Sequence, residues 1–189
     1  LRSLETGLSG LDEVEIAEAN AGGNRDAIRA ALARPTPDRI LTIAQAFRYG
    51  FTVSEVQAAC KYDLWFLERV RELVETEARV QREGLPHDGP GWTKLKQQGF
   101  SDARLAVLAG TTEAAVTTAR HHAGVRPVYK RIDTCAAEFA SRTPYMYSTY
   151  EGDGFAPPES EDEATARDKV IILGGGPNRI GQGIEFDYC

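Results

Sequence analysis

The sequence has little of what disulfide-rich, zinc-binding and membrane proteins need. Its three cysteines, Cys60, Cys135 and Cys189, lie far apart and form no CxxC pair, so neither a disulfide framework nor a zinc site is predicted. The histidines lack the i,i+4 spacing by which one helix face presents two metal ligands. No apolar run approaches the roughly 20 residues that cross a bilayer, and no signal peptide is visible. We therefore expect a protein of the reducing cytoplasm with no metal and no membrane partner.

A surplus of basic charge is also missing. The chain carries 22 Lys and Arg against 28 Asp and Glu, a formal net charge of -6, whereas phosphate contacts need a basic surface. A helical segment from Thr112 to Ala123 could be imagined as a DNA-recognition helix. Its early exposed positions offer Thr111, Glu113 and Thr117 instead of residues that read base edges, and Arg120 arrives late. No nucleic-acid partner is expected.

Helical patterns and their capping signals fill the middle of the chain. Asn24 is a good N-cap, Thr52 and Glu55 have capping-box spacing, and Asp63 precedes the longest apolar stripe. Gly84 ends that stripe. The predicted helices begin after Asn24 and then cover 38–49, 52–60, 64–83, 92–98, 101–109 and 112–123.

The longest predicted helix has an unusual first turn, in which Leu64, Trp65, Phe66 and Leu67 are all apolar. This pattern predicts a helix that starts deep in the core and emerges into solvent, with a narrower stripe further on. The expected core residues are Phe47, Trp65, Phe66, Leu67, Leu105 and Val116, and the expected stripe is Val70, Leu73, Val74 and Ala78.

Two stretches of the helical region resemble each other. They align without a gap from Gly50-Phe51-Thr52 and from Gly99-Phe100-Ser101. The alignment favours two copies of one helix–turn–helix unit, although two capped amphipathic helices also align somewhat by chance. The matched pairs are Val56 with Leu105, Asp63 with Thr112, Leu67 with Val116 and Arg71 with Arg120.

The character of the sequence changes after Gly124. Segments 128–134 and 145–150 are rich in β-branched and aromatic residues and predict short strands, with a short helix over 135–141 between them. Segment 151–167 is acidic and contains proline and glycine, which predicts a solvated linker. Segment 169–173 then predicts a buried strand of the parallel type.

A glycine-rich turn follows that strand, with Gly174, Gly175 and Gly176, and then Gly181 and Gly183. Such a turn can bring backbone amides close to an anion, but a tight turn without a ligand fits the spacing equally well. The dinucleotide fingerprint is broken because Arg179 stands in place of a glycine. The P-loop pattern is broken because Gln182 stands in place of the lysine.

The stretches ETGLSG, DLWFLERVRELV, GFSDARLAVLAG, VYKRIDTCAAEFA and GGGPNRIGQGIEFDYC follow one another along the chain, and together they resemble the carbamoyl-phosphate synthase large subunit family. GGGPNRIGQGIEFDYC is similar to the opening of the second synthetase half of that family, and VYKRIDTCAAEFA with TPYMYSTYE resembles the stretch before it. DLWFLERVRELV and GFSDARLAVLAG resemble its oligomerisation domain, and ETGLSG resembles the junction that leaves the first half. The matches run through the chain in the family's order.

The resemblance implies a mainly α fold. We expect a compact helical bundle of the oligomerisation-domain type with short extended segments, plus the first β-strand of a truncated α/β domain. The expected divisions are a connection from the first half (1–23), the helical domain (24–150), an acidic linker (151–167) and the start of the second ATP-grasp half (168–189). The lack of an initiator methionine fits an internal piece of a longer protein.

The resemblance also implies a role for the parent protein. Members of this family are ATP-dependent ligases that make carbamoyl phosphate, for pyrimidines and arginine, from bicarbonate, glutamine-derived ammonia and two ATP. The full enzyme uses ATP, Mg²⁺ or Mn²⁺ and K⁺, and works with a glutaminase small subunit and other copies of the large subunit. The present piece is expected to bind none of these cofactors, to hold no catalytic residue, and to join and oligomerise the halves.

One residue role follows from the resemblance. Glu185, in IEFDY, resembles a carboxylate that lines the internal carbamate passage, although it could equally cap a helix that Gly181 and Gly183 open. An alternative function for the whole chain is a free-standing helical protein-interaction module with no enzymatic role.

Overall fold

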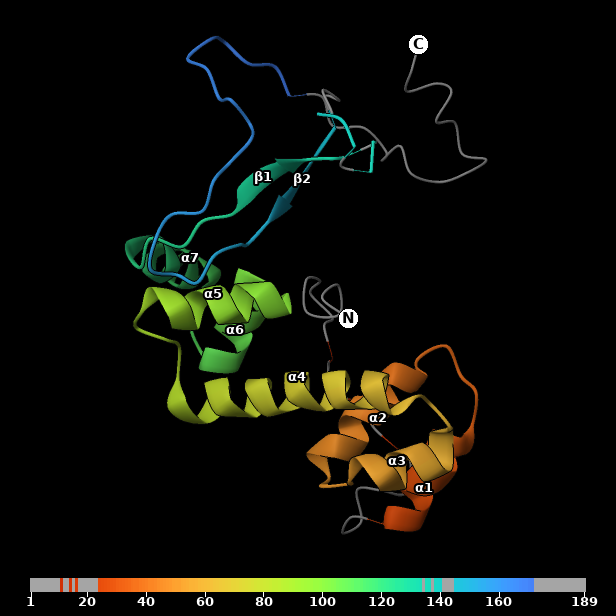
Figure 1. Ribbon diagram of the computed structural model, residues 1–189. Coiled ribbons are helices and arrows are strands. Elements are labelled where there is room, and N and C mark those ends of the chain that lie inside the picture. Colours follow the sequence, from red (N-terminus) through yellow and green to blue (C-terminus); the bar gives the residue numbers. More distant parts are fainter. Residues whose placement is uncertain are drawn as a thin grey trace.

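The computed structural model describes residues 11, 14, 16, 24–133, 135–136, 138–140 and 145–171. Within these residues the fold is mainly α: seven helices are followed by a small antiparallel sheet of two strands (Figure 1). The predicted mainly helical class is confirmed. The helices are α1 (Arg25–Ala33), α2 (Arg39–Arg48), α3 (Val53–Cys60), α4 (Leu64–Glu83), α5 (Gly89–Gln98), α6 (Asp102–Ala109) and α7 (Glu113–His122), and the strands are β1 (Val128–Arg131) and β2 (Met146–Thr149).

Side-chain caps set where these helices start. The Asn24 side chain accepts hydrogen bonds from the first backbone amides of α1, and Asp63 accepts one from the Trp65 amide at the start of α4. Thr52 and Glu55 form the predicted reciprocal capping box. One start differs from expectation: α5 begins at Gly89, before the predicted start at 92, because Asp88 caps it by accepting from the Gly91 amide at 2.9 Å.

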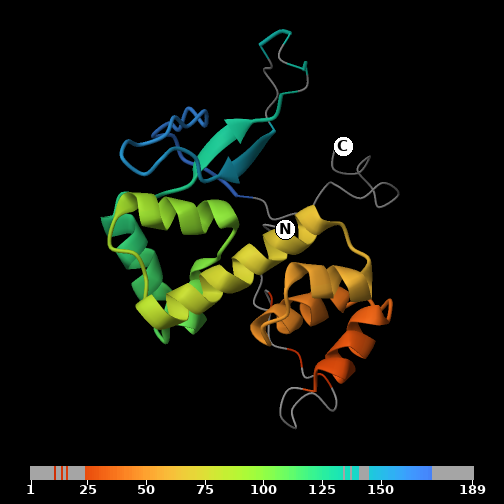
Figure 2. The same ribbon diagram turned by 60° about the horizontal axis from the view of Figure 1, so that its bottom comes forward.

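Helix α4 joins two groups of helices (Figures 1 and 2). Helices α1, α2 and α3 lie around its N-terminal half, and α5, α6 and α7 lie over its C-terminal half. Helix α4 contacts α2 and α3 of the first group and α6 of the second group. The buried apolar residues of both groups form one continuous core. We call α2–α4 the first unit and α5–α7 the second unit.

The structure supports the predicted internal repeat. Helices α3 and α6 have eight residues each, and both end at a left-handed residue, Lys61 with φ 62° and Gly110 with φ 63°. The matched anchors are buried in both copies, and the similarity extends upstream to α2 and α5, which bury Ile43 and Trp92 at the same spacing. Chance alignment of amphipathic helices explains neither the shared turn nor the shared burial. The buried anchor pairs are Phe51 with Phe100, Val56 with Leu105, and Leu67 with Val116.

The expected burial of the first turn of α4 is wrong. Leu64, Trp65 and Phe66 are 45%, 58% and 52% exposed, whereas Leu67 is 1% exposed. A helix of 3.6 residues per turn can direct only part of an all-apolar turn at one core. Leu67 belongs to the buried stripe of α4, whereas Phe66 remains exposed although it lies one turn before Val70. Ala78 is exposed as well, whereas Phe47, Leu105 and Val116 are buried as predicted.

The two strands form an antiparallel ribbon in which Val128 lies opposite Thr149 and Arg131 opposite Met146. Both strands lie within the segments predicted for them. The helix predicted over 135–141 is wrong for the described residues 135, 136 and 138–140, which form a turn and bends. Ala136 has a φ of 52°, in the left-handed region, and such a residue cannot continue a right-handed helix.

The segment predicted as a solvated linker has neither helix nor strand over the described residues, but it is not free of the fold. Its first part lies against α5, where the Gln97 side chain donates to the Gly152 carbonyl at 2.9 Å. Gly154 has a φ of 85° and approaches the Gly89 backbone so closely that a side chain would clash. The predicted buried strand is described only over 169–171, where Val170 and Ile171 are exposed and pair with no strand.

Candidate functional site

The sequence-predicted site residues fall outside the described part of the chain. These are Glu185 and the turn glycines Gly174, Gly175, Gly176, Gly181 and Gly183. Among the residues that are described, no group of three or more His, Cys, Asp or Glu is placed to hold a metal ion. No helix in the described part is long and apolar enough to cross a membrane. The features that stand out are three ionic clusters and one exposed aromatic surface.

The first cluster joins the two units, and we call Arg48, Glu77 and Arg104 the inter-unit cluster. The Glu77 carboxylate on α4 accepts from Arg48 Nη2 of α2 at 2.6 Å and from Arg104 Nε of α6 at 2.9 Å. Arg48 also donates to the Leu11 carbonyl. The Glu77 side chain is 4% exposed, so it depends on these two cations for the solvation it has lost. The cluster thereby fixes the position of α6 against α2 and α4.

A surface hollow of about 600 Å³ lies beside the inter-unit cluster, between α2, α4 and α6. The two arginines that line the hollow, Arg48 and Arg104, are both paired with Glu77. The rest of the wall is mainly aliphatic. The lining residues are Phe47, Arg48, Val74, Glu75, Glu77, Ala78, Gln81, Arg104, Val107 and Leu108.

The second cluster, which we call the Asp102 cluster, holds the second unit together. Asp102 on α6 accepts from Lys96 Nζ of α5 at 2.8 Å, from Arg120 Nη2 of α7 at 2.7 Å and from Thr117 Oγ1 at 2.9 Å. Arg120 also donates to the Val125 carbonyl at 2.9 Å, beyond the end of α7. One carboxylate therefore links three helices.

Charge neighbours control the ionisation of this cluster. Burial by itself would raise the pKa of Asp102, but the hydrogen bonds from Arg120, Lys96 and Thr117 outweigh it and lower the pKa to about 2. Burial lowers the pKa of Lys96, and the bond to Asp102 opposes that shift. Asp102 is therefore ionised throughout the neutral range, with its oxygens already engaged.

Tyr150 connects the Asp102 cluster to the ribbon. It directly follows β2, and its ring lies 5.1 Å from Lys96 Nζ and 5.7 Å from the Arg120 guanidinium carbon. Burial raises the pKa of the Tyr150 hydroxyl. The ring packs against the hydrophobic core, so the ribbon is anchored on the second unit.

The third cluster holds part of the acidic segment against the free edge of β1. Glu161 donates its backbone N–H to the Tyr129 carbonyl at 2.8 Å, and its side chain accepts from the Arg131 amide at 2.9 Å. The Tyr129 amide donates to Ser160 Oγ at 3.1 Å. Lys130 Nζ lies 3.4 Å from the Glu161 carboxylate. We call residues 159–163 the acidic strap.

The strap contacts shift the ionisation of Glu161. The hydrogen bond from the Arg131 amide lowers the pKa of its carboxyl, and the Lys130 ammonium adds to that effect. Two weaker ion pairs extend the cluster, from Lys130 to Glu151 at 3.7 Å and from Arg131 to Glu163 at 3.7 Å. Some acidic residues of the predicted solvated linker thus pair with the basic residues of β1 instead of facing only solvent.

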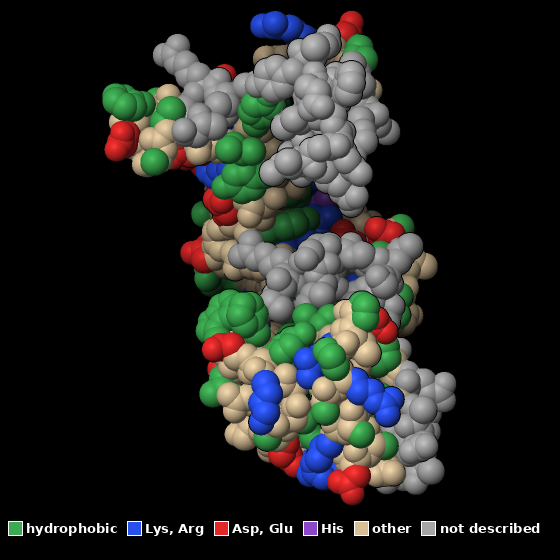
Figure 3. All heavy atoms as spheres, turned by 90° about the vertical axis from the view of Figure 1, so that its right-hand side faces the viewer, with side chains coloured by type: hydrophobic (Ala, Val, Ile, Leu, Met, Phe, Trp, Pro, Cys, Tyr) green, Lys and Arg blue, Asp and Glu red, His purple; other side chains and the backbone are tan. Residues whose placement is uncertain are grey.

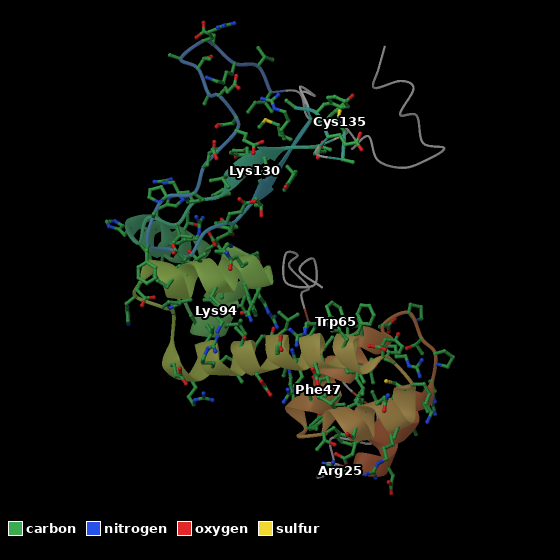
Figure 4. All side chains as sticks on the ribbon, viewed as in Figure 1. Arg25, Phe47, Trp65, Lys94, Lys130 and Cys135 are labelled. Atoms are coloured by element: carbon green, nitrogen blue, oxygen red, sulfur yellow. The ribbon has the colours of Figure 1, made fainter. Side chains whose placement is uncertain are left out.

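The exposed first turn of α4 and Tyr62, two residues before it, form a surface that we call the aromatic patch: Tyr62, Leu64, Trp65 and Phe66. The Trp65 and Phe66 rings meet edge to face, with centroids 4.9 Å apart. Trp65 lies on the side of α4 turned away from α3 (Figure 4). Seen from the side where α4 begins, hydrophobic side chains gather at the level of this helix (Figure 3).

Comparison with known proteins relates two parts of the chain to family models. Residues 1–124 match a model described as the oligomerisation domain of the carbamoyl-phosphate synthetase large chain. Residues 166–189 match a model described as the carbamoyl phosphate synthase preATP-grasp domain. The aromatic patch and the inter-unit cluster lie within the first match.

Curated relatives match the whole chain. The carbamoyl phosphate synthase large chain of Rhizobium meliloti is 57% identical over 100% of this chain, which corresponds to 16% of that relative. The large chains of Brucella melitensis and Xanthomonas campestris are 56% and 49% identical, again over 100% of this chain, and the matches cover 16% and 17% of those proteins. The chain thus spans about one sixth of the length of these relatives.

Proposed function

Because this chain belongs to the family of carbamoyl-phosphate synthetase large-chain oligomerisation domains, we propose that it joins and self-associates the large chain of a carbamoyl phosphate synthase. In this proposal the parent is an ATP-dependent ligase that uses bicarbonate, glutamine-derived ammonia and two ATP. Its partners are a glutaminase small subunit and further copies of the large chain. The relatives are about six times longer, so the parent's catalytic machinery has its place in the remaining polypeptide.

We propose that the two buried carboxylates, Asp102 and Glu77, hold neither ATP nor a divalent metal. The Asp102 oxygens are engaged by Lys96, Arg120 and Thr117, and Glu77 is engaged by two arginines. A metal would have to displace these partners, and a nucleotide would compete with the buried carboxylates for the same cations. We therefore assign no step of phosphoryl transfer to these residues, since that chemistry needs positioned metal ions and cationic clamps.

The ionic clusters suit a rigid joint. The inter-unit cluster holds the second unit on α4, and the Asp102 cluster with Tyr150 holds the ribbon on the second unit. The acidic strap then ties the chain to the ribbon shortly before residue 166, where the preATP-grasp match begins. We propose that these contacts restrict how freely the following domain moves relative to the helices. We propose that residues 24–150 form the helical domain and that the linker of residues 151–167 is partly docked on it.

We further propose that Glu185 lines the carbamate passage of the parent, on the strength of the IEFDY resemblance alone. A carboxylate in the wall would repel an anionic intermediate and keep it moving. In the full-length parent, Glu185→Ala should then raise the amount of ATP consumed per carbamoyl phosphate formed. Unchanged coupling with normal folding would favour the helix-capping role.

The observation that carries the proposal is the succession of the two family matches along one chain. The test uses the 189-residue chain and the full-length parent side by side. We expect the parent to turn over ATP in the presence of bicarbonate and the chain alone to show no turnover. We also expect sedimentation of the chain to show a mass that rises with concentration. ATP turnover by the isolated chain, or a monomer at every concentration, would contradict the corresponding half of the proposal.

A further inference from the structure

We infer that the aromatic patch is the surface on which a second copy of this chain docks. The inference rests on the self-association proposed above and assigns it to Tyr62, Leu64, Trp65 and Phe66. Of these, Trp65 and Phe66 are more than half exposed and lie side by side. Adjacent exposed aromatic rings are typical of the energetic centre of protein interfaces.

The patch is held ready for binding before any partner arrives. It lies on the first turn of a 20-residue helix, whose start is capped by Asp63 and anchored by the buried Leu67. The Arg69 guanidinium lies 5.9 Å from the Trp65 ring and is held there by Glu72 at 2.6 Å. Rings that are fixed in advance lose little conformational entropy on docking, so more of the free energy gained by burying them contributes to affinity.

The charges around the patch favour a second copy over a partner of one charge sign. Arg39 lies over the Tyr62 ring at 5.3 Å, and Arg69 and Glu72 follow the patch along α4. Glu68 and Asp63 add carboxylates to the same rim. A rim that carries both signs can meet itself across a twofold axis, with Arg69 of one copy opposite a carboxylate of the other. A nucleic acid or an acidic membrane would require a basic rim.

The position of the patch separates it from the following domain of the parent. The ribbon and the strap, which lead to the preATP-grasp match, lie over the second unit, on its side away from α4 (Figure 1). The patch lies at the N-terminal end of α4 and inside the match to the oligomerisation domain. Among the described residues, the ribbon and strap leave the first turn of α4 uncovered, so a second copy can reach it.

Tryptophan fluorescence gives a direct readout, because the chain has only two tryptophans. Trp92 is 1% exposed, so its emission should already be that of a buried indole, whereas Trp65 is 58% exposed. If copies meet at the patch, emission shifts to the blue as concentration rises, in step with the mass measured by sedimentation. Trp65→Phe keeps an aromatic ring at the patch and should retain association while losing the shift.

The decisive variant is the double substitution Trp65→Ser with Phe66→Ser, which leaves the buried Leu67 in place. We expect the dissociation constant of the 189-residue chain to rise by roughly thirtyfold or more, with an unchanged circular dichroism spectrum. The matched control is Val107→Ser, on α6, which removes another exposed apolar side chain at 72% exposure and should change the dissociation constant little.

The outcomes separate this inference from the proposal on which it depends. If the wild-type chain is monomeric throughout, the proposed self-association itself fails. If wild type and double variant associate equally, self-association stands and the patch assignment is overturned. If the double variant lowers the thermal stability of the full-length parent without changing its mass, the patch is covered by the same polypeptide, which also overturns the assignment.

Discussion

Glu77 and Arg104 form a buried ion pair between α4 and α6, with Arg104 Nε 2.9 Å from Glu77 Oε1. The pair lies between the two repeat units, each of which has its own capped helices and buried anchors. Replacing both ionic partners of such a pair by apolar residues often costs nothing, so its presence says little about net stability. Removing one partner is different, because the others stay buried and unpaired.

Glu77→Ala should therefore lower the free energy of unfolding by about 3–5 kcal/mol, since Arg48 and Arg104 would keep their burial and lose their common counter-ion. Urea denaturation followed by circular dichroism measures this loss. The control is Glu75→Ala on the same helix, whose side chain is 60% exposed and pairs with the exposed Arg71. That variant should lose no more than about 1 kcal/mol. Equal losses in the two variants would contradict a special role for Glu77.

The Asp102 cluster predicts a specific loss of stability in acid. The folded-state pKa of Asp102 is depressed from its ordinary value of 3.8 to about 2, so its contribution is fully present above about pH 4 and disappears as the pH falls toward 2. The contribution amounts to roughly 2 kcal/mol. Asp102→Asn should therefore be less stable than wild type at neutral pH, and the difference should shrink below about pH 4.

The measurement for Asp102 is the free energy of unfolding of both proteins between about pH 2 and pH 7. Asp26→Asn serves as the control, because the Asp26 side chain is 91% exposed and engages only its near neighbour Arg29. Its difference from wild type should be small at every pH. A difference for Asp102→Asn that is constant across the range would mean that the carboxyl titrates normally.

Local signals in the sequence predict the helices well, because a cap and its helix lie within a few residues of each other. Thr52 with Glu55 and Asp63 with Trp65 are such neighbours, and these starts are where the sequence places them. The ionic clusters could not be predicted in this way. Glu77 finds its partners on α2 and α6, and each of these contacts exists only once the helices have packed.

The first turn of α4 shows a second limit. Four apolar residues in a row do not show which of them faces the core, and the later stripe does not settle it, because Phe66 and Leu67 both lie about one turn before Val70. The acidic strap shows that charge composition, like an apolar run, does not by itself predict which contacts a segment makes. An acidic segment rich in proline and glycine is typical of a solvated linker, and its docking depends on Lys130 and Arg131 at a distant place in the sequence.

Leu67 and Trp65 lie in the same apolar turn of α4 but should respond differently to truncation. Leu67→Ala should cost about 2–5 kcal/mol, because it leaves a cavity in a close-packed core. Trp65→Ala should cost about 0.5 kcal/mol or less, because that ring is more than half exposed. Both are measured by urea denaturation at concentrations at which the chain is monomeric. A loss for Trp65→Ala that matched the loss for Leu67→Ala would mean that the core face of α4 is assigned wrongly.

The acidic strap makes a prediction about individual amides. A two-stranded ribbon is marginally stable alone, so the strap should protect the edge of β1 from solvent. Glu161→Gln weakens the ionic contact to Lys130, and we expect faster hydrogen exchange at the Tyr129 and Arg131 amides, which donate to the strap. The Ile132 amide donates to Tyr145 across the ribbon and should change much less.

Salt and pH should act on the strap as the Glu161 substitution does. High salt screens the contact of Lys130 with Glu161, and because the folded-state pKa of Glu161 is depressed, acid removes the contact as the pH falls below the ordinary glutamate value. Both conditions should therefore accelerate exchange at Tyr129 and Arg131 in wild type and have little further effect in Glu161→Gln. The exposed neighbour Asp162, changed to Asn, is the matched control and should leave these amides protected. Equal exchange at all three amides in every variant would mean that the strap does not bind the edge of β1, and the parent's second half would then follow a free linker instead of a docked one.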